Sequence, residues 1–294
     1  CRQLRSSPLQ ACGGTMALLG LDVRPRPPNW SGDYIQGSVT DRAAVECAME
    51  CGVHTVIHIA AYHGVHERPV LEGQEPKDAH DFWELNVTGT FQVFEAAARA
   101  GVGRVIYISS TSIPRERHGL YGHTKVLSEQ IAATYAQRHG MRVITLRPRA
   151  FVPHTDTAVY RDWLEWAQHF TRGAVHVDDV ARCVWLALAR LGAREWRFKA
   201  PPVCAVDGRI DFTEEQLEDW DAEGEGSTFT SVYGAEACDL LRSHGLDPSR
   251  APRRASRHQE HTHEAEELLG YRPTYGIGSL LEELKRYGPD GPPP

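Results

Sequence analysis

The sequence lacks long hydrophobic runs and any excess of positive charge. No apolar run reaches the roughly 18 to 20 residues that a membrane-spanning helix needs. The 294 residues carry a formal net charge of −7, so no net positive field attracts nucleic acid or an anionic membrane surface. We therefore expect a protein that binds neither a membrane nor a nucleic acid, while a local basic pocket for a phosphorylated small molecule is still allowed.

The sequence also lacks a complete set of metal ligands. Its seven cysteines are odd in number and scattered, which favours reduced thiols in a cytoplasmic protein over a disulfide framework. Cys47 and Cys51 lie four residues apart, but no second pair of cysteines or histidines completes a zinc site. His258, His261 and His263 stand in a polar segment without a partner cluster. We predict that the protein binds no metal.

Short apolar runs alternate with longer amphipathic ones from residue 17 to about residue 147, a pattern typical of βα units around a parallel sheet. We predict strands over residues 17–22, 34–39, 54–60, 104–110 and 141–146, and helices over residues 41–51, 78–100 and 121–139. The strand over 54–60 carries no acid, lysine or arginine, as expected for a strand covered on both faces. The predicted fold class is therefore α/β, with a doubly wound parallel sheet.

The alternation of strand-like and helix-like segments becomes less regular beyond residue 150. Residues 173–191 fit a short strand followed by a helix, whereas residues 207–263 are polar and poor in strand signals. We expect a first domain over residues 1–150, whose opening βα unit is incomplete, and a segment over 151–287 that partly completes the sheet and forms a small C-terminal lobe. Residues 288–294 have the composition of a disordered tail.

The segment Tyr121-Gly-His-Thr-Lys125 carries the clearest chemical signal. Tyrosine and lysine at positions i and i+4 share one helix face, so the ammonium stabilises a phenolate and lowers the pKa of the phenol. A neighbouring hydroxyl orients a substrate oxygen while the tyrosine moves the proton. Such a pair also arises by chance, but this one opens a helix directly after the strand that ends in Ser109-Ser-Thr-Ser112. Open α/β sheets bind their ligands at that end of a strand.

Several segments together resemble the extended short-chain dehydrogenase/reductase family, the NAD-dependent epimerases and dehydratases. They are LDVRP from residue 21, VIHIAA from 56, NVTGTFQVFEAAARAGVGRVIYISSTS from 86, YGHTK from 121, LRPRAFVP from 146, AVHVDDVA from 174 and ELLGYRPTYGIGSLLEELKRYG from 267. The resemblance covers residues 17 to about 192 and the C-terminal ending. It implies a Rossmann-like domain that binds NAD and a C-terminal lobe that binds substrate.

The resemblance implies a role for each matching residue of the active site. Tyr121 would be the general acid/base, and Lys125 would bind the ribose hydroxyls of NAD and depress the pKa of the tyrosine. Thr111 would be the hydroxyl partner, with Ser110 as the alternative. His63 or Arg149 would meet the substrate.

The resemblance also implies how the cofactor is held. Asp22 matches the acid that takes the adenosine ribose hydroxyls, which favours NAD over NADP, although Arg24 leaves some room for a 2′-phosphate. Further contacts to the cofactor are expected from Ser38, Val39, Ala60, Ala61, Asn86 and Pro148. The pair Ser38-Val39 stands where the family usually has an aspartate before an aliphatic residue.

A glycine-rich phosphate loop is missing from the expected place. In the family, this loop follows the first strand, and the acid that ends the second strand comes about 20 residues after the loop. The strand over 17–22 matches that second strand, so counting back from Asp22 puts the loop at or before residue 4. The nearby Cys12-Gly-Gly-Thr15 comes too late and lacks the required spacing. We expect that the sequence starts just after the loop, in preference to a natural chain that has lost it.

The expected function is NAD(P)-dependent hydride transfer on a sugar, a nucleotide sugar or a related hydroxyl or carbonyl compound. Dehydrogenase, epimerase and dehydratase remain open, although the short connection from Thr111 to Tyr121 favours a small substrate. The alternatives are a non-catalytic dinucleotide-binding sensor or scaffold, and a truncated inactive chain. The resemblance suggests a homodimer through the helices over 78–100 and 121–139.

Overall fold

A computed structural model describes residues 17–67, 75–113, 119–218, 220, 227–249 and 259–293. The expectations for Cys1, for Cys12 to Thr15 and for His258 lie outside these residues, as does the side chain of His261. The chain divides into two compact units, which we describe separately. The first unit contains the chain up to Arg147 and Val184–Cys204, and the second contains Pro148–Cys183 and Ala205–Pro294.

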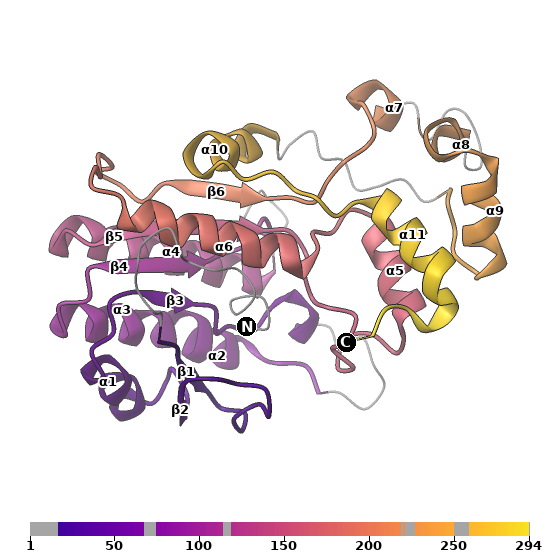
Figure 1. Ribbon diagram of the computed structural model, residues 1–294. Helices are drawn as coiled ribbons and strands as arrows, with labels where there is room; N and C mark the ends of the chain where they lie inside the picture. Colours follow the sequence, from indigo (N-terminus) through magenta and orange to yellow (C-terminus); the bar gives the residue numbers. More distant parts are fainter. Residues whose placement is uncertain are drawn as a thin grey trace. The chain divides into compact units, whose positions relative to one another are not determined.

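Parallel strands form the frame of the first unit. Strand β1 (Leu19–Asp22) pairs in parallel with β2 (Asp33–Gln36), and a second sheet has the order β3-β4-β5-β6. Its strands are β3 (Val56–His58), β4 (Arg104–Ile108), β5 (Arg142–Pro148) and β6 (Val203–Val206). Strand β4 runs parallel to both of its neighbours β3 and β5. The predicted α/β class with a parallel sheet is confirmed (Figure 1).

The helices of the first unit follow the predicted order. They are α1 (Arg42–Glu50), α2 (Ala79–Phe82), a π-helical segment η4 (Trp83–Thr88), α3 (Gly89–Arg99) and α4 (Leu120–His139). Asp41 caps α1, since its carboxylate accepts the N–H groups of Ala43 and Ala44. Helix α4 ends at Gly140, whose φ of 65° suits glycine. The one departure inside the predicted helix over 78–100 is its π-helical middle.

The core of the first unit lies between its helices and β4. Phe94 of α3 and Val105 of β4 are fully buried and belong to one cluster with Val45, Tyr107 and Val143. Residues that alternate with these along the strands are buried as well, including Ile106 and Ile144 at 0% exposure. Burial on both faces is what a doubly covered parallel strand requires. Strand β4, which leads to the serine-rich segment, is therefore held rigidly.

Strand β3 departs from its prediction. The strand is only three residues long, Val56 and Ile57 are half-buried, and Ile59 is 54% exposed. Among the described residues β3 pairs with β4 alone and is therefore an edge strand of its sheet. The predicted strand over 54–60 is thus longer than the observed one, and Val56 and Ile57 are less buried than residues of a strand covered on both faces.

The second unit is mainly helical. It contains α5 (Trp163–Thr171), α7 (Glu214–Glu218), α8 (Ser227–Tyr233), α9 (Ala235–Ser243), α10 (Gln259–Leu269) and α11 (Ile277–Tyr287), and α6 (Val177–Gly192) begins in it. No strand is described between residues 173 and 176, where one was predicted. The tail predicted to be disordered instead forms a 3₁₀ turn at Gly288–Asp290.

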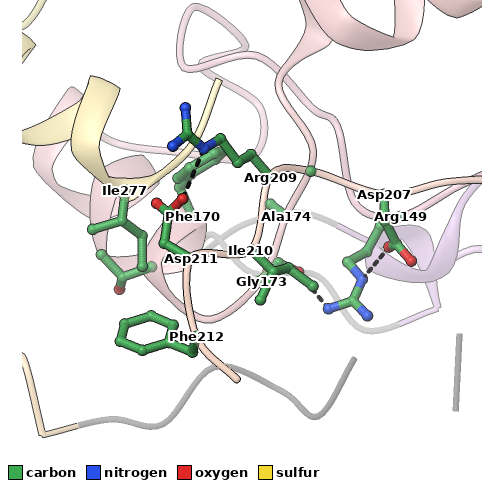
Figure 2. A pocket seen from close by; sticks show the side chains of 12 residues that line it. Arg149, Phe170, Gly173, Ala174, Asp207, Arg209, Ile210, Asp211, Phe212 and Ile277 are labelled. Atoms are coloured by element: carbon green, nitrogen blue, oxygen red, sulfur yellow. Dashed lines mark hydrogen bonds and ion pairs between the residues drawn. The ribbon is translucent and has the colours of Figure 1, made fainter. Parts of the chain in front are cut away.

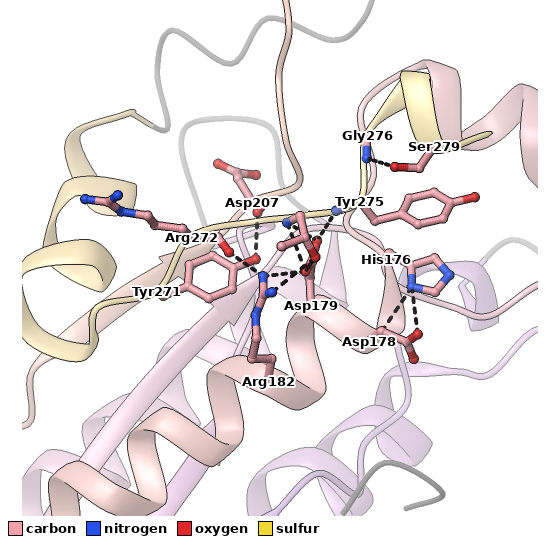
Figure 3. A network of polar contacts seen from close by, with 11 residues as sticks. His176, Asp178, Asp179, Arg182, Asp207, Tyr271, Arg272, Tyr275, Gly276 and Ser279 are labelled. Carbon is pink, nitrogen blue, oxygen red and sulfur yellow. Dashed lines mark hydrogen bonds and ion pairs between the residues drawn. The ribbon is translucent and has the colours of Figure 1, made fainter. Parts of the chain in front are cut away.

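A buried aspartate organises part of the second unit (Figure 3). Asp179 is 1% exposed, and its carboxylate accepts hydrogen bonds from Arg182, from the hydroxyl and N–H of Thr274 and from the N–H of Tyr275. The Tyr275 ring stacks on His176, with the ring centroids 4.1 Å apart. The first turn of α6 is thereby joined to the segment that precedes α11.

Candidate active site

Helix α4 presents Tyr121 and Lys125 on one face, as the spacing predicted. Lys125 is 3% exposed, and its Nζ donates a hydrogen bond of 2.9 Å to the carbonyl oxygen of Ile108 at the end of β4. The same Nζ lies 5.9 Å from the centroid of the Tyr121 ring and 5.2 Å from that of Tyr107. The ammonium therefore sits between the two phenol rings, anchored to the strand end.

The serine-rich segment after β4 supplies the neighbouring hydroxyl. Interaction with Ser110 lowers the pKa of Tyr121, but burial has the larger effect, and the pKa of Tyr121 lies above its usual value. The Ser110 Oγ also accepts the N–H of Ser112 at 3.0 Å. Thr111 is half-buried, and the described residues show no bond between it and Tyr121. Ser110, the alternative hydroxyl, is thus near enough to lower the pKa of Tyr121.

Burial changes the charge that Lys125 carries. It lowers the pKa of Lys125 to about 7, while the nearby Glu129 acts in the opposite direction. Glu129 itself is paired with Arg147 at 2.6 Å. Lys125 is therefore deprotonated more easily than an exposed lysine.

Asn86 connects three parts of the first unit. Its Oδ1 accepts the N–H of Tyr62 at 2.8 Å, and its Nδ2 donates to the Tyr62 carbonyl at 3.0 Å and to Thr124 Oγ1 of α4 at 2.9 Å. The Asn86 carbonyl lies in the π-helical segment, where it accepts the hydroxyls of Thr90 and Ser128. At 1% exposure Asn86 is fully engaged within the protein. It holds the loop at Tyr62 against α4.

That loop runs past Tyr121 and includes a 3₁₀ turn, η3 (Gly64–His66). Gly64 lies beside the Tyr121 ring, since a Cβ placed on it would come 3.7 Å from the ring. The carboxylate of Glu67 accepts the backbone N–H of Tyr121. His63 packs edge-on against His66, with the ring centroids 4.3 Å apart. Sequence reasoning missed Glu67 because nothing in its spacing marks a contact across 54 residues.

The residues expected to hold the adenosine half of a cofactor lie at or after the ends of β1, β2 and β3. Asp22 ends β1, is exposed, and accepts the N–H of Arg24 through Oδ1 at 2.9 Å. Ala60 and Ala61 follow β3, the first exposed and the second half-buried. The Ser38 hydroxyl is 2.8 Å from that of Thr40, and Val39 is 8% exposed within the core. Asp22 and Ala60 are thus the most accessible of this set.

Pro148 and Arg149 belong to the second unit. Pro148 is buried, and the Arg149 guanidinium forms an ion pair of 2.6 Å with Asp207 (Figure 2). The two side chains are only 10% and 5% exposed. Arg149 also lines a small cavity with Gly173, Phe212 and Ile277. Its charge is therefore compensated, and a substrate anion would have to compete with Asp207.

The described residues contain no group of three or more metal-ligating side chains. Among the histidines singled out from the sequence, His263 pairs with Glu267 of the same helix at 3.0 Å. In the part of the chain that the structure describes, no helix is long and apolar enough to cross a bilayer.

A buried histidine beside the site makes stability depend on pH. His58 is 4% exposed, and its Nε2 donates to Thr90 Oγ1 at 2.9 Å, because the Thr90 hydroxyl proton is used on the Asn86 carbonyl. Burial and then the charge of Lys125 lower the pKa of His58 to about 3. The ordinary value is about 6.5, so between these two pH values the unfolded chain binds a proton that the folded chain does not.

We therefore expect the free energy of unfolding to fall as the pH is lowered from 7 towards 4. In a His58→Gln variant the decline should be shallower, because glutamine cannot take up that proton. Urea unfolding of both proteins at pH 7, 6, 5 and 4 measures the two slopes. Equal slopes would show that His58 is not buried in its neutral form.

Comparison with known proteins places the chain among its relatives. The model of the NAD dependent epimerase/dehydratase family matches residues 9–196. A uronate dehydrogenase of Pseudomonas putida is 28% identical over 129 residues, which are 39% of this chain and 44% of that protein. This chain thus spans less than two thirds of the length of that relative.

Solved structures share the fold. A short-chain dehydrogenase/reductase superfamily protein from Agrobacterium tumefaciens with bound NAD has a TM-score of 0.63 at 18% identity, over 96% of this chain and 92% of the other. The UDP-glucuronic acid 4-epimerase from Bacillus cereus in complex with NAD has a TM-score of 0.58 at 16% identity, over 90% and 88%. With the family model covering well over half of its residues, this chain belongs to the NAD dependent epimerase/dehydratase family.

Proposed function

We propose that this protein transfers a hydride between NAD and a hydroxyl-bearing carbon of a sugar or sugar acid, with Tyr121 as the proton-transfer residue. The observation that carries the proposal is the arrangement of Tyr121, Lys125 and Ser110. A phenol, a buried ammonium and a hydroxyl meet at the end of a parallel strand, where α/β sheets bind ligands.

Each group has a step to perform. Tyr121 reacts as the phenolate: its Oη takes the proton of the substrate hydroxyl as the substrate carbon loses hydride, and the resulting phenol returns that proton in the reverse direction. Lys125 in its protonated form would stabilise this phenolate and so oppose the effect of burial, which raises the pKa of Tyr121. The hydroxyl of Ser110, or of Thr111 when substrate is present, orients the reacting oxygen.

The residues of the first unit fit NAD. When bound, NAD supplies the hydride acceptor. The exposed carboxylate of Asp22, which is engaged only locally with Arg24, would accept the adenosine ribose hydroxyls, a choice that favours NAD over NADP. Lys125 would bind the other ribose, and Ser38, Ala60 and Ala61 would line the pocket. Val39 and Asn86 are buried and would support that lining from inside the first unit.

We propose a uronate or a related sugar acid as substrate, because a uronate dehydrogenase is among the relatives and because the connection from Thr111 to Tyr121 is short. His63 lies in the loop that passes Tyr121 and would contact the substrate. Arg149 would bind the carboxylate if the substrate displaces Asp207 from part of the guanidinium.

A homodimer and a cytoplasmic location complete the proposal. Trp83 and Phe91 are 53% and 47% exposed on the helical stretch over residues 79–99, and a second copy of the same helices would cover them. The exposed thiols of Cys47 and Cys51 suit a reducing compartment.

Incubation with NAD and a panel of uronates, aldoses and UDP-sugars tests the function. We expect NADH absorbance to accumulate with a uronate. Formation of an epimer without net NADH would identify an epimerase, because that reaction returns the hydride. Binding of NAD in a calorimeter without any turnover would favour a non-catalytic sensor, and the absence of both would contradict the proposal.

A further inference from the structure

Helix α4 begins without a cap of its own. Its N-cap residue is Gly119, which has no side chain to accept the first N–H groups, and its first turn contains no acidic residue. Unpaired N–H groups at a helix start are costly when partly buried, and they are normally satisfied by the N-cap side chain. The helix that carries Tyr121 and Lys125 therefore needs an acceptor from elsewhere.

Glu67 supplies that acceptor. Its Oε1 lies 2.5 Å from the backbone nitrogen of Tyr121, across 54 residues of sequence. A carboxylate at this position also interacts favourably with the positive end of the dipole of a 20-residue helix. The contact is thus a helix cap made by a different segment of the chain.

The fit between Glu67 and Gly119 is close. A Cβ added to Gly119 would overlap Oε2 and Cδ of Glu67 and come 2.9 Å from Oε1. The φ of Gly119 is −70°, which any residue adopts, so the backbone conformation does not require glycine. The glycine makes room for the Glu67 carboxylate.

The loop that carries Glu67 is fixed at its other end. Asn86 holds both backbone polar groups of Tyr62 and also binds Thr124 of α4. Between these two attachments the backbone at Gly64 lies beside the Tyr121 ring. The segment from Tyr62 to Glu67 is therefore joined to α4 on both sides of the tyrosine.

We propose that Glu67 is a positioning residue that caps α4 and thereby fixes the first turn of the helix and the placement of Tyr121. The proposal rests on the function proposed for Tyr121. Displacement of a reacting group by about 1 Å lowers rates by roughly 100-fold. Loss of the cap should therefore lower kcat more than it changes the KM for NAD, which we expect to bind mainly through residues outside the first turn of α4.

Amide hydrogen exchange over residues 119–125 tests the cap without any need for activity. In Glu67→Ala we expect exchange at Tyr121 to be roughly 2- to 30-fold faster, the range that corresponds to loss of an N-cap. The matched control is Glu50→Ala, an exposed glutamate of α1, which should leave this exchange unchanged. Unchanged exchange in Glu67→Ala would overturn the proposal.

Two double variants separate a cap from a general packing role. In Glu67→Ala the overlap at residue 119 is relieved, so adding Gly119→Asp places an N-cap acceptor on the helix itself and should restore slow exchange. Adding Gly119→Ala to Glu67→Ala supplies no acceptor for the N–H groups and should therefore not restore slow exchange. Gly119→Ala alone should resemble Glu67→Ala, because the methyl group displaces the carboxylate. Failure of Gly119→Asp to restore slow exchange would contradict the cap.

Turnover then tests whether the cap positions Tyr121. We expect kcat to fall roughly 10- to 100-fold in Glu67→Ala and to recover to within about threefold when Gly119→Asp is added. Recovery of slow exchange without recovery of kcat would overturn the positioning role. If the unaltered protein turns over no substrate, the proposed function fails, while the exchange experiment still decides the cap.

Discussion

Replacing Tyr121 by phenylalanine is expected to lower kcat by a factor of about 100 to 10,000, the range that removal of a general acid/base produces. The substitution removes only the hydroxyl. The ring keeps its place beside Gly64, and the backbone N–H keeps its bond to Glu67. The fold and the affinity for NAD should therefore be unchanged, so kcat falls while the Kd for NAD does not.

Steady-state kinetics, circular dichroism and calorimetry with NAD together measure this result. Tyr62→Phe is the matched control, because Tyr62 lies in the adjoining loop and contacts Asn86 through its backbone alone. That variant should retain turnover within about threefold. If Tyr121→Phe kept turnover within about tenfold of the unaltered protein, proton transfer by Tyr121 would be excluded.

Replacing Asp179 by asparagine is expected to lower the free energy of unfolding by about 3–5 kcal/mol, as for other buried charge pairs that lose one partner. The Asp179 carboxylate accepts from a guanidinium, a hydroxyl and two N–H groups at once (Figure 3). An amide has one accepting oxygen, and its NH₂ group would face donors. The N–H groups of Thr274 and Tyr275 would then be left without full partners.

Urea unfolding at neutral pH measures the change, and Asp178→Asn is the control. Asp178 is the adjacent residue, but its side chain is 54% exposed, and its Oδ2 lies 3.6 Å from Nδ1 of His176, whose pKa burial lowers. Loss of the charge on an exposed carboxylate of this kind should change the free energy of unfolding by about 0–1 kcal/mol. A similar effect of the two substitutions would show that the Asp179 network does not hold the second unit together.

Much of the fold could be predicted because hydrophobic period and turn residues are local signals. The strand over 104–110 and the helices over 41–51 and 121–139 were placed to within a few residues. Strand β6 and helix α5 were not predicted. Strand β6 is short, and α5 lies beyond the region in which strand-like and helix-like segments alternate regularly. The exposure of β3 depends on which strands lie beside it, and no local pattern contains that information.

Some features of the candidate site could likewise be predicted from the sequence, and others could not. The pairing of Tyr121 with Lys125 follows from a spacing of four residues on one helix, so the sequence alone was sufficient to predict it. Which hydroxyl lies near the tyrosine depends on the tertiary structure: Ser110 lowers the pKa of Tyr121, while the choice between Ser110 and Thr111 as the hydroxyl partner stays a prediction. Only the structure could reveal that Glu67 caps α4 and that Asp207 compensates Arg149. Contacts between residues more than 50 positions apart depend on how the chain folds back on itself, so they cannot be predicted from the spacing of residues along the sequence.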